Sequence, residues 1–356
     1  MSMNKRIINF NQKKNQNSKP YLIAEIGVNH EGSFDKAIEL INLAKEGGAD
    51  AAKFQSYKAK TLASKNSPSY WDTNLEPTLS QYELFKKYDS FDEQEYISLA
   101  RHCEKIGIDF LSTPFDDKSI DFLDPIVPFF KIASADLTNI PFLRKVAQKN
   151  KPIILSTGAA TLAEIDLAVR TIEEISGTPP SLMHCILCYP TSNEDANLIM
   201  IKHLKRSFPQ CIIGYSDHTI PDSAMTAVVS SFILGAEVIE KHFTFNKELK
   251  GNDHYHAMDI NDLKNLNKIL DKISILLGKE SIKRPIDNEL LSRKNARRSI
   301  VLKKNLSANE IIKENDLTYK RPGTGISPVF WDEIIGKKVK YALQEDYILK
   351  WNDIID

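Results

Sequence analysis

Two histidines, His218 and His242, are the residues of this chain whose types and spacing best suit metal chemistry. Each ends an apolar run, in Ile212-Ile213-Gly214-Tyr215-Ser216-Asp217-His218-Thr219 and in Val238-Ile239-Glu240-Lys241-His242-Phe243. Runs of this form are typical of buried parallel strands that carry polar side chains to one end of an α/β fold. Neutral imidazoles, together with a carboxylate and water, suit Mn²⁺ or Zn²⁺ and less easily Mg²⁺. We therefore interpret His218 and His242 as ligands of one divalent cation, with Mn²⁺ expected and Mg²⁺ or Co²⁺ as alternatives.

The other histidines have a simpler interpretation. A single histidine near a strand end is more often a packed core residue than a ligand, and His102, His184 and His203 fit that description. His218 and His242 differ because they recur at matching ends of neighbouring strands, beside Glu240. The run Asp253-His254-Tyr255-His256 is expected to form a loop over the same end, with Asp253 a candidate acceptor for a substrate hydroxyl.

Two lysines lie within apolar runs, in Ala52-Lys53-Phe54 and Phe130-Lys131-Ile132. Burying an ammonium group without a partner costs several kcal/mol, so each lysine should meet an anion. Hydroxyl residues at the ends of other expected strands could share that anion, and these are Thr113, Ser134, Ser156 and Ser216. Such a set suits a phosphate or a carboxylate. In the alternative interpretation, the lysines only pair with Glu25 and Glu240 in a structural network.

The elements that must position these residues repeat eight times. The expected strands are Tyr21–Gly27, Ala51–Tyr57, Asp109–Pro114, Phe129–Ser134, Pro152–Thr157, Leu182–Tyr189, Ile212–Thr219 and Val238–Phe243. The expected helices are 34–46, 93–106, 116–123, 140–149, 161–176, 196–206, 221–234 and 260–277, with a polar insertion at 58–91. Eight such units in about 260 residues predict an α/β fold of the (β/α)₈ TIM-barrel type, whose active site lies at the carboxyl ends of the strands. A doubly wound open sheet is the alternative, but the chain has no glycine-rich nucleotide turn.

The domain boundaries follow from changes in composition. Residues 1–20 are expected to be a polar N-terminal arm, 21–278 the barrel, 279–298 a linker and 299–356 a small β-rich domain. The small domain contains Arg321-Pro322-Gly323, a rigid turn that presents an arginine.

Composition excludes several classes of function. The 356 residues include 47 Lys and Arg and 47 Asp and Glu, so the formal net charge is zero and indicates no binding to nucleic acid or to acidic membranes. No apolar run approaches the roughly 18 residues of a membrane span, and no secretory signal is apparent at the N-terminus. The four cysteines, at 103, 185, 188 and 211, lack framework spacing and are expected to be reduced thiols of a cytoplasmic protein.

With these motifs assembled, the chain resembles the sialic acid synthase family, which are phosphoenolpyruvate-dependent synthases of nonulosonic acids. The matching runs are Ala24-Glu25-Ile26-Gly27-Val28-Asn29-His30-Glu31-Gly32, Lys53-Phe54-Gln55, Ser112-Thr113-Pro114-Phe115, Ile154-Leu155-Ser156-Thr157-Gly158, Tyr189-Pro190-Thr191, Gly214-Tyr215-Ser216-Asp217-His218-Thr219, Glu240-Lys241-His242-Phe243 and Lys320-Arg321-Pro322-Gly323. The C-terminal segment resembles the antifreeze-like (SAF) domain of that family. This domain reaches over the barrel of the partner subunit there, so the resemblance implies a domain-swapped homodimer.

The resemblance also implies roles for individual residues. Phosphoenolpyruvate would be bound by Lys53, Gln55, Thr113, Lys131, Ser134, Ser156 and Ser216. His218 and His242 would ligate the metal, and Glu25 and Glu240 would be the catalytic carboxylates. The sugar would contact Tyr189, Asp136, Asp253 and, from the partner subunit, Arg321. Two departures concern the sugar: Leu187 stands where sialic acid-forming members have Asn, and Ala133-Ser134-Ala135-Asp136 replaces Gly-Ser-Gly-Glu.

The implied reaction joins phosphoenolpyruvate to the aldehyde of an N-acyl amino sugar and gives a nonulosonic acid and phosphate. The acceptor could be N-acetylmannosamine, its 6-phosphate or a deoxy diacetamido sugar. One alternative is a shorter-chain 2-keto-3-deoxy sugar acid synthase, although such enzymes lack the appended β-rich domain. Another is a non-catalytic glycan-binding barrel, which predicts loss of the strand-end set that is present here.

Overall fold

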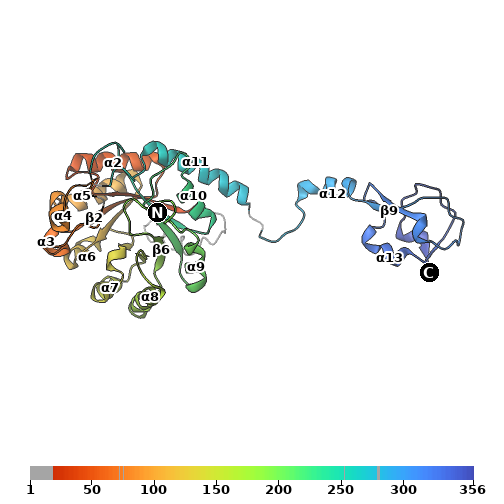
Figure 1. Cartoon of the computed structure of the whole chain (residues 1–356), viewed down its shortest axis with the longest axis horizontal. Coiled ribbons are helices and arrows are strands. Elements are labelled where there is room, and N and C mark those ends of the chain that lie inside the picture. The colour runs from red at the N-terminus through yellow and green to blue at the C-terminus, as the bar shows by residue number, and fades with distance from the viewer. Residues whose placement is uncertain (1–18, 72, 75, 252, 279–280) are drawn as a thin grey trace. The chain divides into compact units, whose positions relative to one another are not determined.

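The computed structural model describes residues 19–71, 73–74, 76–251, 253–278 and 281–356 of the chain. These residues belong to two compact units, Met1–Lys279 and Glu280–Asp356 (Figure 1). Residues 1–18 of the expected N-terminal arm lie outside the described residues.

The first unit is the predicted (β/α)₈ barrel. Its parallel strands are β1 (Tyr21–Gly27), β2 (Ala51–Ser56), β3 (Asp109–Pro114), β4 (Phe130–Ile132), β5 (Ile153–Ser156), β6 (Ser181–Cys185), β7 (Ile213–Asp217) and β8 (Val238–His242). They are hydrogen-bonded in the order β3-β2-β1-β8-β7-β6-β5-β4. The two end strands, β3 and β4, lie against each other, which closes the ring. Helices surround this ring in Figure 1.

Most of the barrel helices lie where the periodicity predicted them. They are α2 (Phe34–Gly47), α5 (Glu93–Ile106), α6 (Asp117–Leu123), α7 (Ile140–Ala147), α8 (Leu162–Ser176), α9 (Met200–Ser207), α10 (Thr226–Ile233) and α11 (Ile260–Leu277). Two further helices, α3 (Ala59–Leu62) and α4 (Gln81–Tyr88), lie in the insertion after β2. Local signals define several ends. For example, Thr161 and Glu164 form a capping box at the start of α8, and Gly177 ends it in the left-handed conformation.

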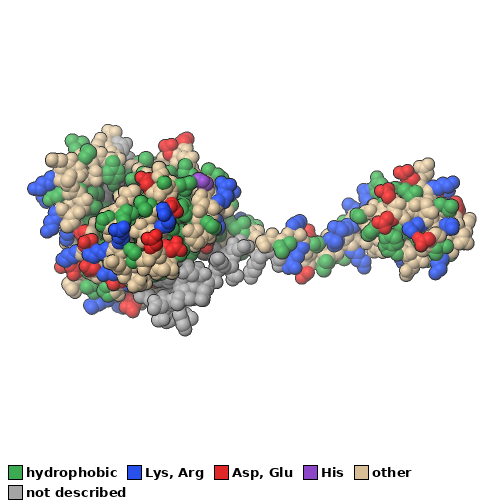
Figure 2. Space-filling view, turned by 90° about the horizontal axis from the view of Figure 1, so that it is seen from below, with side chains coloured by type: hydrophobic (Ala, Val, Ile, Leu, Met, Phe, Trp, Pro, Cys, Tyr) green, Lys and Arg blue, Asp and Glu red, His purple; other side chains and the backbone are tan. Residues whose placement is uncertain are grey.

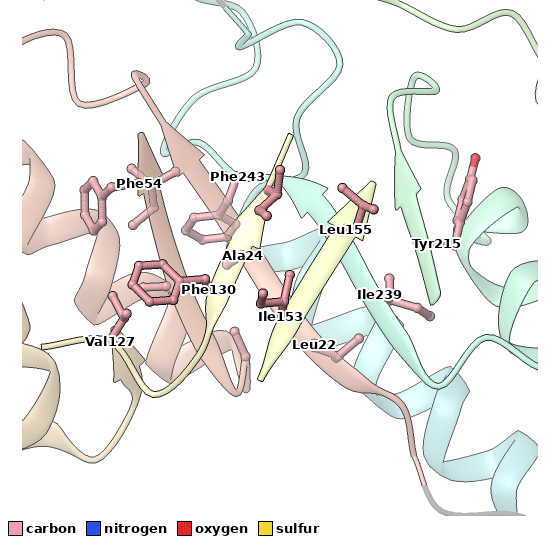
Figure 3. Close-up of a cluster of buried hydrophobic side chains, with 14 of the residues drawn as sticks. Leu22, Ala24, Phe54, Val127, Phe130, Ile153, Leu155, Tyr215, Ile239 and Phe243 are labelled. Carbon is pink, nitrogen blue, oxygen red and sulfur yellow. The ribbon is translucent and has the colours of Figure 1, made fainter. Parts of the chain in front are cut away.

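Side-chain alternation along the strands divides the barrel into two apolar layers. Leu22 and Ala24 of β1 pack outward with helix residues such as Leu40, and Figure 3 shows part of this layer. Ile23 belongs instead to a small cluster of strand residues that fills the amino-terminal half of the barrel interior. The inward position that follows it is Glu25, which is buried. The interior therefore changes from apolar to charged toward the carboxyl ends of the strands.

The second unit is small and has its own core. Strands β9 (Ser299–Leu302) and β10 (Leu317–Lys320) pair antiparallel, as do β11 (Lys338–Val339) and β12 (Ile354–Ile355). The alternation of residues 341–348 also predicts a strand there, but within that segment only Leu343 and Ile348 form bridges, and these are isolated. The unit also contains α12 (Leu290–Ala296), inside the segment expected as a linker, and α13 (Trp331–Ile334). Gly323 N donates a hydrogen bond to Lys294 O, which attaches α12 to the turn after Arg321.

The surface agrees with the balanced charge of the sequence. Figure 2 shows Lys and Arg side chains interspersed with Asp and Glu on the face that it draws. Among the described residues, no helix has both the length and the apolar character needed to cross a membrane.

Candidate active site

Lys53 and Glu25 form the centre of a buried charged cluster at the carboxyl ends of the strands. The two residues are directly paired in the register of β1 and β2. Lys53 Nζ lies 2.6 Å from Glu25 Oε2 and 3.7 Å from Glu240 Oε2, and it donates a hydrogen bond to Thr113 Oγ1 at 2.9 Å. The side chains of Lys53 and Glu25 are only 3% and 2% exposed, so solvent screens this ion pair weakly.

Glu240 joins the second lysine to the same cluster. Lys131 Nζ lies 3.7 Å from Glu240 Oε1 and donates a hydrogen bond to Ser156 Oγ at 2.7 Å. Ser216 Oγ donates to Glu240 Oε1 at 3.1 Å. Lys53 thus contacts both carboxylates and one hydroxyl, Lys131 contacts Glu240 and a second hydroxyl, and Ser216 bonds to Glu240. The carboxylate contacts agree with the structural-network interpretation too, but that interpretation does not account for the hydroxyls.

A backbone irregularity positions Glu25 and Gln55. The pairing of β1 with β2 shifts by one residue between Glu25 and Gly27, and Gly27 has a φ of +55°. A Cβ atom at Gly27 would lie 3.2 Å from Gln55 Nε2 and 3.3 Å from Glu25 Oε1. Glycine leaves room there for Gln55 Nε2 to donate its hydrogen bond to Glu25 Oε1 at 2.9 Å.

Burial and mutual charge set different protonation states for the two carboxyls. Burial raises the pKa of Glu25 to about 7, although Lys53 acts in the opposite direction. Burial also disfavours the charged form of Glu240, but Lys131 and Lys53 outweigh it and hold the pKa of Glu240 below its usual value. For Lys131, burial prevails over Glu240 and lowers the pKa. Near neutral pH, Glu240 is therefore ionised while Glu25 can take up or release a proton.

A cluster of aromatic and imidazole rings lies beside this charged cluster. The ring centroids of His218 and His242 are 5.4 Å apart, and that of His256 is 4.7 Å from His242. The ring centroid of Tyr189 is 4.2 Å from that of His218 and 5.8 Å from that of His256. Burial, together with the neighbouring imidazoles, holds the pKa of His242 and of His256 well below the usual range. Both rings are therefore neutral, which is the form that binds metals.

His256 was not among the predicted site residues, but it lies at the centre of this ring cluster. Ligand atoms of His242, Asp253 and His256 lie within 4.8 Å of one another, so the three could hold a metal ion. Asp253 and His256 are three residues apart in the loop after β8. The intervening His254 instead contacts Thr244 Oγ1 through its Nδ1 at 2.8 Å. The Asp-x-x-His spacing was a signal in the sequence, but its meaning depended on the path of the loop.

Comparisons with known proteins agree with this architecture. The NeuB family model matches residues 40–282, which is more than half of the chain, and the SAF domain model matches residues 297–355. This chain belongs to the NeuB family. N,N'-diacetyllegionaminic acid synthase of Legionella pneumophila is 40% identical over 94% of this chain and 94% of its own length. The enzyme of the same name from Campylobacter jejuni is 38% identical over 93% of this chain and 99% of its own.

A solved structure of a relative supports the fold of this NeuB-family chain. The N-acetylneuraminic acid (sialic acid) synthetase of Leptospira borgpetersenii superimposes with a TM-score of 0.69 and 32% identity, covering 78% of this chain and 90% of that one. The predicted resemblance to sialic acid synthases is therefore confirmed. The NeuB-family synthases named above are enzymes that make sugar acids.

The remaining predicted site residues of the NeuB-family chain are Ser134, Asp136, Asp253 and Arg321. Ser134 Oγ accepts a hydrogen bond from Gly158 N at 2.9 Å, so a backbone amide fixes it near the end of β5. Asp136 is half-buried and accepts a hydrogen bond from Asn139 Nδ2, and burial raises its pKa. Arg321 is exposed in the second unit. Burial also raises the pKa of Asp253 to about 6.

A separate cavity of about 400 Å³ lies on the helical side of β7 and β8, where it is lined by Asp217, Lys241 and Met225 among others. Its buried polar groups already bind one another, because Asp217 accepts from Lys241 Nζ at 2.5 Å and from Tyr215 OH at 2.7 Å. We therefore place the candidate active site at the lysine and imidazole clusters and not in this cavity.

Proposed function

We propose that this NeuB-family chain condenses phosphoenolpyruvate with the open-chain aldehyde of an N-acyl amino sugar, giving a nonulosonic acid and phosphate. One observation carries the proposal. Two buried lysines and their hydroxyl partners share two carboxylates, Glu25 and Glu240, at the same end of the barrel as a cluster of imidazoles. That combination suits an anionic enol phosphate on one side and a carbonyl to be polarised on the other.

The charges of the cluster favour binding of an anion together with a cation. Lys53, Lys131 and ionised Glu240 sum to +1, and Glu25 reduces this sum toward zero as it loses its proton near pH 7. Phosphoenolpyruvate carries a carboxylate and a phosphate, and a phosphate monoester alone has a charge of about −1.5 to −2. The lysines by themselves therefore do not balance the substrate, so a divalent cation would make binding more favourable.

The residues present fit such a cation. The Nδ1 atom of His242 is buried without a hydrogen-bond partner. Nδ1 of His218 lies 2.9 Å from Ile186 O, which can only accept a hydrogen, so in the neutral ring Nε2 carries the lone pair. Burial disfavours the charged form of His218, but Cys185 outweighs it and raises the pKa, so a cation would have to bind the neutral form of this ring. We propose that His218 and His242 hold Mn²⁺, with Mg²⁺ or Co²⁺ able to replace it. When bound, the ion would act as a Lewis acid that polarises the aldehyde of the sugar.

The chain's own residues then account for binding and proton transfer. Lys53, Gln55, Thr113, Lys131, Ser134, Ser156 and Ser216 would hold the phosphate and carboxylate so that C3 of the enol faces the aldehyde carbon. When the C–C bond has formed, a water molecule adds at C2 and must lose a proton. Glu25, with its pKa of about 7, is suited to accept that proton, while Glu240 stays ionised beside the developing positive charge at C2. Cleavage of the C2–O bond releases phosphate and leaves the 2-keto acid.

The acceptor that we propose is a deoxy sugar with two acetamido groups. Its support is that two relatives, at 40% and 38% identity, are N,N'-diacetyllegionaminic acid synthases. Tyr189, Asp136 and Asp253 would contact this sugar. Arg321, presented by the SAF domain of the partner subunit in a domain-swapped homodimer, would bind an acyl group.

A phosphate-release assay tests the proposal. Purified enzyme with phosphoenolpyruvate is offered N-acetylmannosamine, its 6-phosphate and a 2,4-diacetamido-2,4,6-trideoxyhexose, each with Mn²⁺ or with EDTA. We expect phosphate release with the diacetamido sugar, loss of release in EDTA, and a product mass equal to the sum of acceptor and phosphoenolpyruvate plus water minus phosphoric acid. Release with none of these sugars would contradict the proposal, and release in EDTA would contradict its metal component.

A further inference from the structure

The strongest unexplained feature of the first unit is a set of buried nitrogens without partners. His256 is 0% exposed, and neither of its ring nitrogens has a hydrogen-bond partner. The neighbouring His242 Nδ1 is also without one. A buried polar atom left unpaired costs about 1–3 kcal/mol, so three such atoms in two adjoining rings indicate a bound species that satisfies at least one nitrogen of each ring.

The geometry of these atoms indicates which kind of species it is. His242 Nδ1 lies 3.3 Å from Asp253 Oδ2, and His256 Nε2 lies 4.0 Å from Asp253 Oδ1. Two ligands on opposite sides of one ion with bonds of about 2.1 Å are about 4.2 Å apart, and neighbouring ligands are closer. The ligand atoms of His242, Asp253 and His256 lie within 4.8 Å of one another, so small side-chain adjustments would bring all three onto one cation.

We propose that His256 is a further metal ligand, and that together with His242 and Asp253 it gives the cation site a third imidazole and a carboxylate. The inference rests on the proposed metal-assisted condensation. It reassigns Asp253 from the sugar to the cation and adds a residue that sequence reasoning did not select. His218 remains in the same ring cluster, with its centroid 6.1 Å from that of His256.

The proposal also specifies the metal preference. Each imidazole that replaces a water or an oxygen ligand favours Co²⁺ and Zn²⁺ over Mn²⁺, and disfavours Mg²⁺ most. A site with three imidazoles should therefore bind Co²⁺ more tightly than Mn²⁺ and should discriminate strongly against Mg²⁺. A different role for His256, as a hydrogen-bond partner of the sugar, predicts the weaker preference of a site with two imidazoles, which removal of His256 would leave unchanged.

Metal binding by the full chain, without substrates, tests the role of His256. The wild-type protein, His256→Ala, His256→Gln and the control His203→Ala are stripped with EDTA, dialysed and titrated with Mn²⁺, and free Mn²⁺ is followed by its electron paramagnetic resonance signal. His203 is exposed on α9, so its removal should leave the Mn²⁺ affinity unchanged. We expect both His256 variants to bind Mn²⁺ at least about tenfold more weakly than the wild type. Unchanged affinity in His256→Ala or His256→Gln would overturn the proposal, as would failure of the wild type to bind Mn²⁺.

A second measurement needs no variant and so does not depend on whether the substitutions fold. X-ray absorption of the wild-type protein loaded with Co²⁺ counts the imidazoles around the ion. Three imidazoles support the proposal, and two overturn it. Because neither experiment uses phosphoenolpyruvate or a sugar, metal binding can succeed while the condensation assay fails. A rise in the KM for the sugar with unchanged Mn²⁺ affinity would assign His256 to the acceptor instead.

Discussion

Asp217 and His218 are adjacent in the chain, yet their side chains lie on opposite sides of the barrel wall. Asp217 accepts hydrogen bonds from Tyr215 OH and Lys241 Nζ in the layer between strands and helices. The His218 ring stands 5.4 Å from that of His242 in the ring cluster. The alternation of side chains along β7 separates the two roles, so one residue stabilises the wall and the next belongs to the candidate active site.

Asp217→Asn should therefore lower stability without altering the chemistry. The substitution leaves Lys241 buried without a counter-charge, which costs about 3–5 kcal/mol of the free energy of unfolding. Chemical denaturation measures this loss, and the kcat of the folded fraction should not change. The control is Asp166→Asn, because Asp166 pairs with Arg170 on the surface, where such pairs contribute about 0–1 kcal/mol. A fall in kcat with unchanged stability would show that Asp217 acts in the reaction.

Glu25→Gln should remove part of the pH dependence of stability. The pKa of Glu25 is about 7 in the folded chain and 4.5 as its ordinary value, so the folded state binds more protons between these limits. Stability is therefore lost as pH rises from about 4.5 to about 7, by up to about 3 kcal/mol from this group.

Denaturation at several pH values compares the wild type with Glu25→Gln and with Glu174→Gln, an exposed control on α8. As pH rises, the free energy of unfolding of the wild type should fall relative to that of Glu25→Gln. The free energy of unfolding of Glu174→Gln should change with pH as that of the wild type does. Parallel curves for the wild type and Glu25→Gln would contradict the raised pKa.

Lys53→Ala should raise the KM for phosphoenolpyruvate more than it lowers kcat. Lys53 would hold the substrate and the leaving phosphate alike, so much of its contribution is uniform binding. Loss of a hydrogen bond to a charged group is worth about 1.5–3 kcal/mol, which corresponds to about a 10- to 150-fold fall in kcat/KM. Steady-state kinetics with the exposed Lys118→Ala as control measures the division. A fall in kcat alone would assign Lys53 a role in the chemical step.

Gly27→Ala should damage the site as well as the backbone. A left-handed φ costs a residue with a Cβ about 1–2 kcal/mol, and at Gly27 that Cβ would also meet Gln55 and Glu25. We expect kcat/KM to fall at least about tenfold through misplacement of Glu25. Gly177→Ala is the matched control, since its φ is +71° but nothing lies within 4 Å of the added atom. We expect both variants to lose a similar amount of stability, but only Gly27→Ala to lose activity. Full activity of Gly27→Ala would contradict this expectation.

Mixing two defective variants tests the proposed domain swap. His242→Ala lacks a proposed metal ligand and Arg321→Ala lacks the proposed contact with the acyl group. If Arg321 serves the partner's barrel, co-expressed chains form mixed dimers in which one site is intact, and activity rises above that of either variant alone. If Arg321 serves its own barrel, each of the two sites in a mixed dimer has one defect. Activity should then not rise above that of the two variants alone. Sedimentation of the same samples establishes the oligomeric state.

Periodicity predicted the barrel well because each strand had to alternate or remain apolar to fill two layers. Its limits lie at local backbone features. The helix expected from residue 221 begins only at Thr226, because Asp222 accepts hydrogen bonds from the amides of Ala224 and Thr226 and Met225 takes a positive φ. The strand expected to reach Tyr189 ends at Cys185, before a turn that contains Pro190.

The candidate site was predictable where strands carry it and less so where a loop does. Lys53 and Glu25 meet because strand register pairs them, and Lys131 and Glu240 join them because alternation along their strands turns all four side chains into the barrel interior. His256 lies on a loop, and a loop has no sequence periodicity that would indicate which side chains point inward. The expected linker at 279–298 shows the same limit, because the short helix α12 is stabilised by a contact with the turn at Gly323 that lies far away in sequence.

The ends of the hydrogen-bonded strand order have a mechanical consequence. Strands β3 and β4 touch but are the two termini of the ladder, and Thr113 and Lys131, which we propose to bind phosphoenolpyruvate, lie on these two strands. An anion held by both would connect two neighbouring strands of the barrel between which the described residues form no backbone ladder. Bound substrate would then stabilise the contact between β3 and β4, and deuterium uptake by the amides of these strands should slow when phosphoenolpyruvate binds.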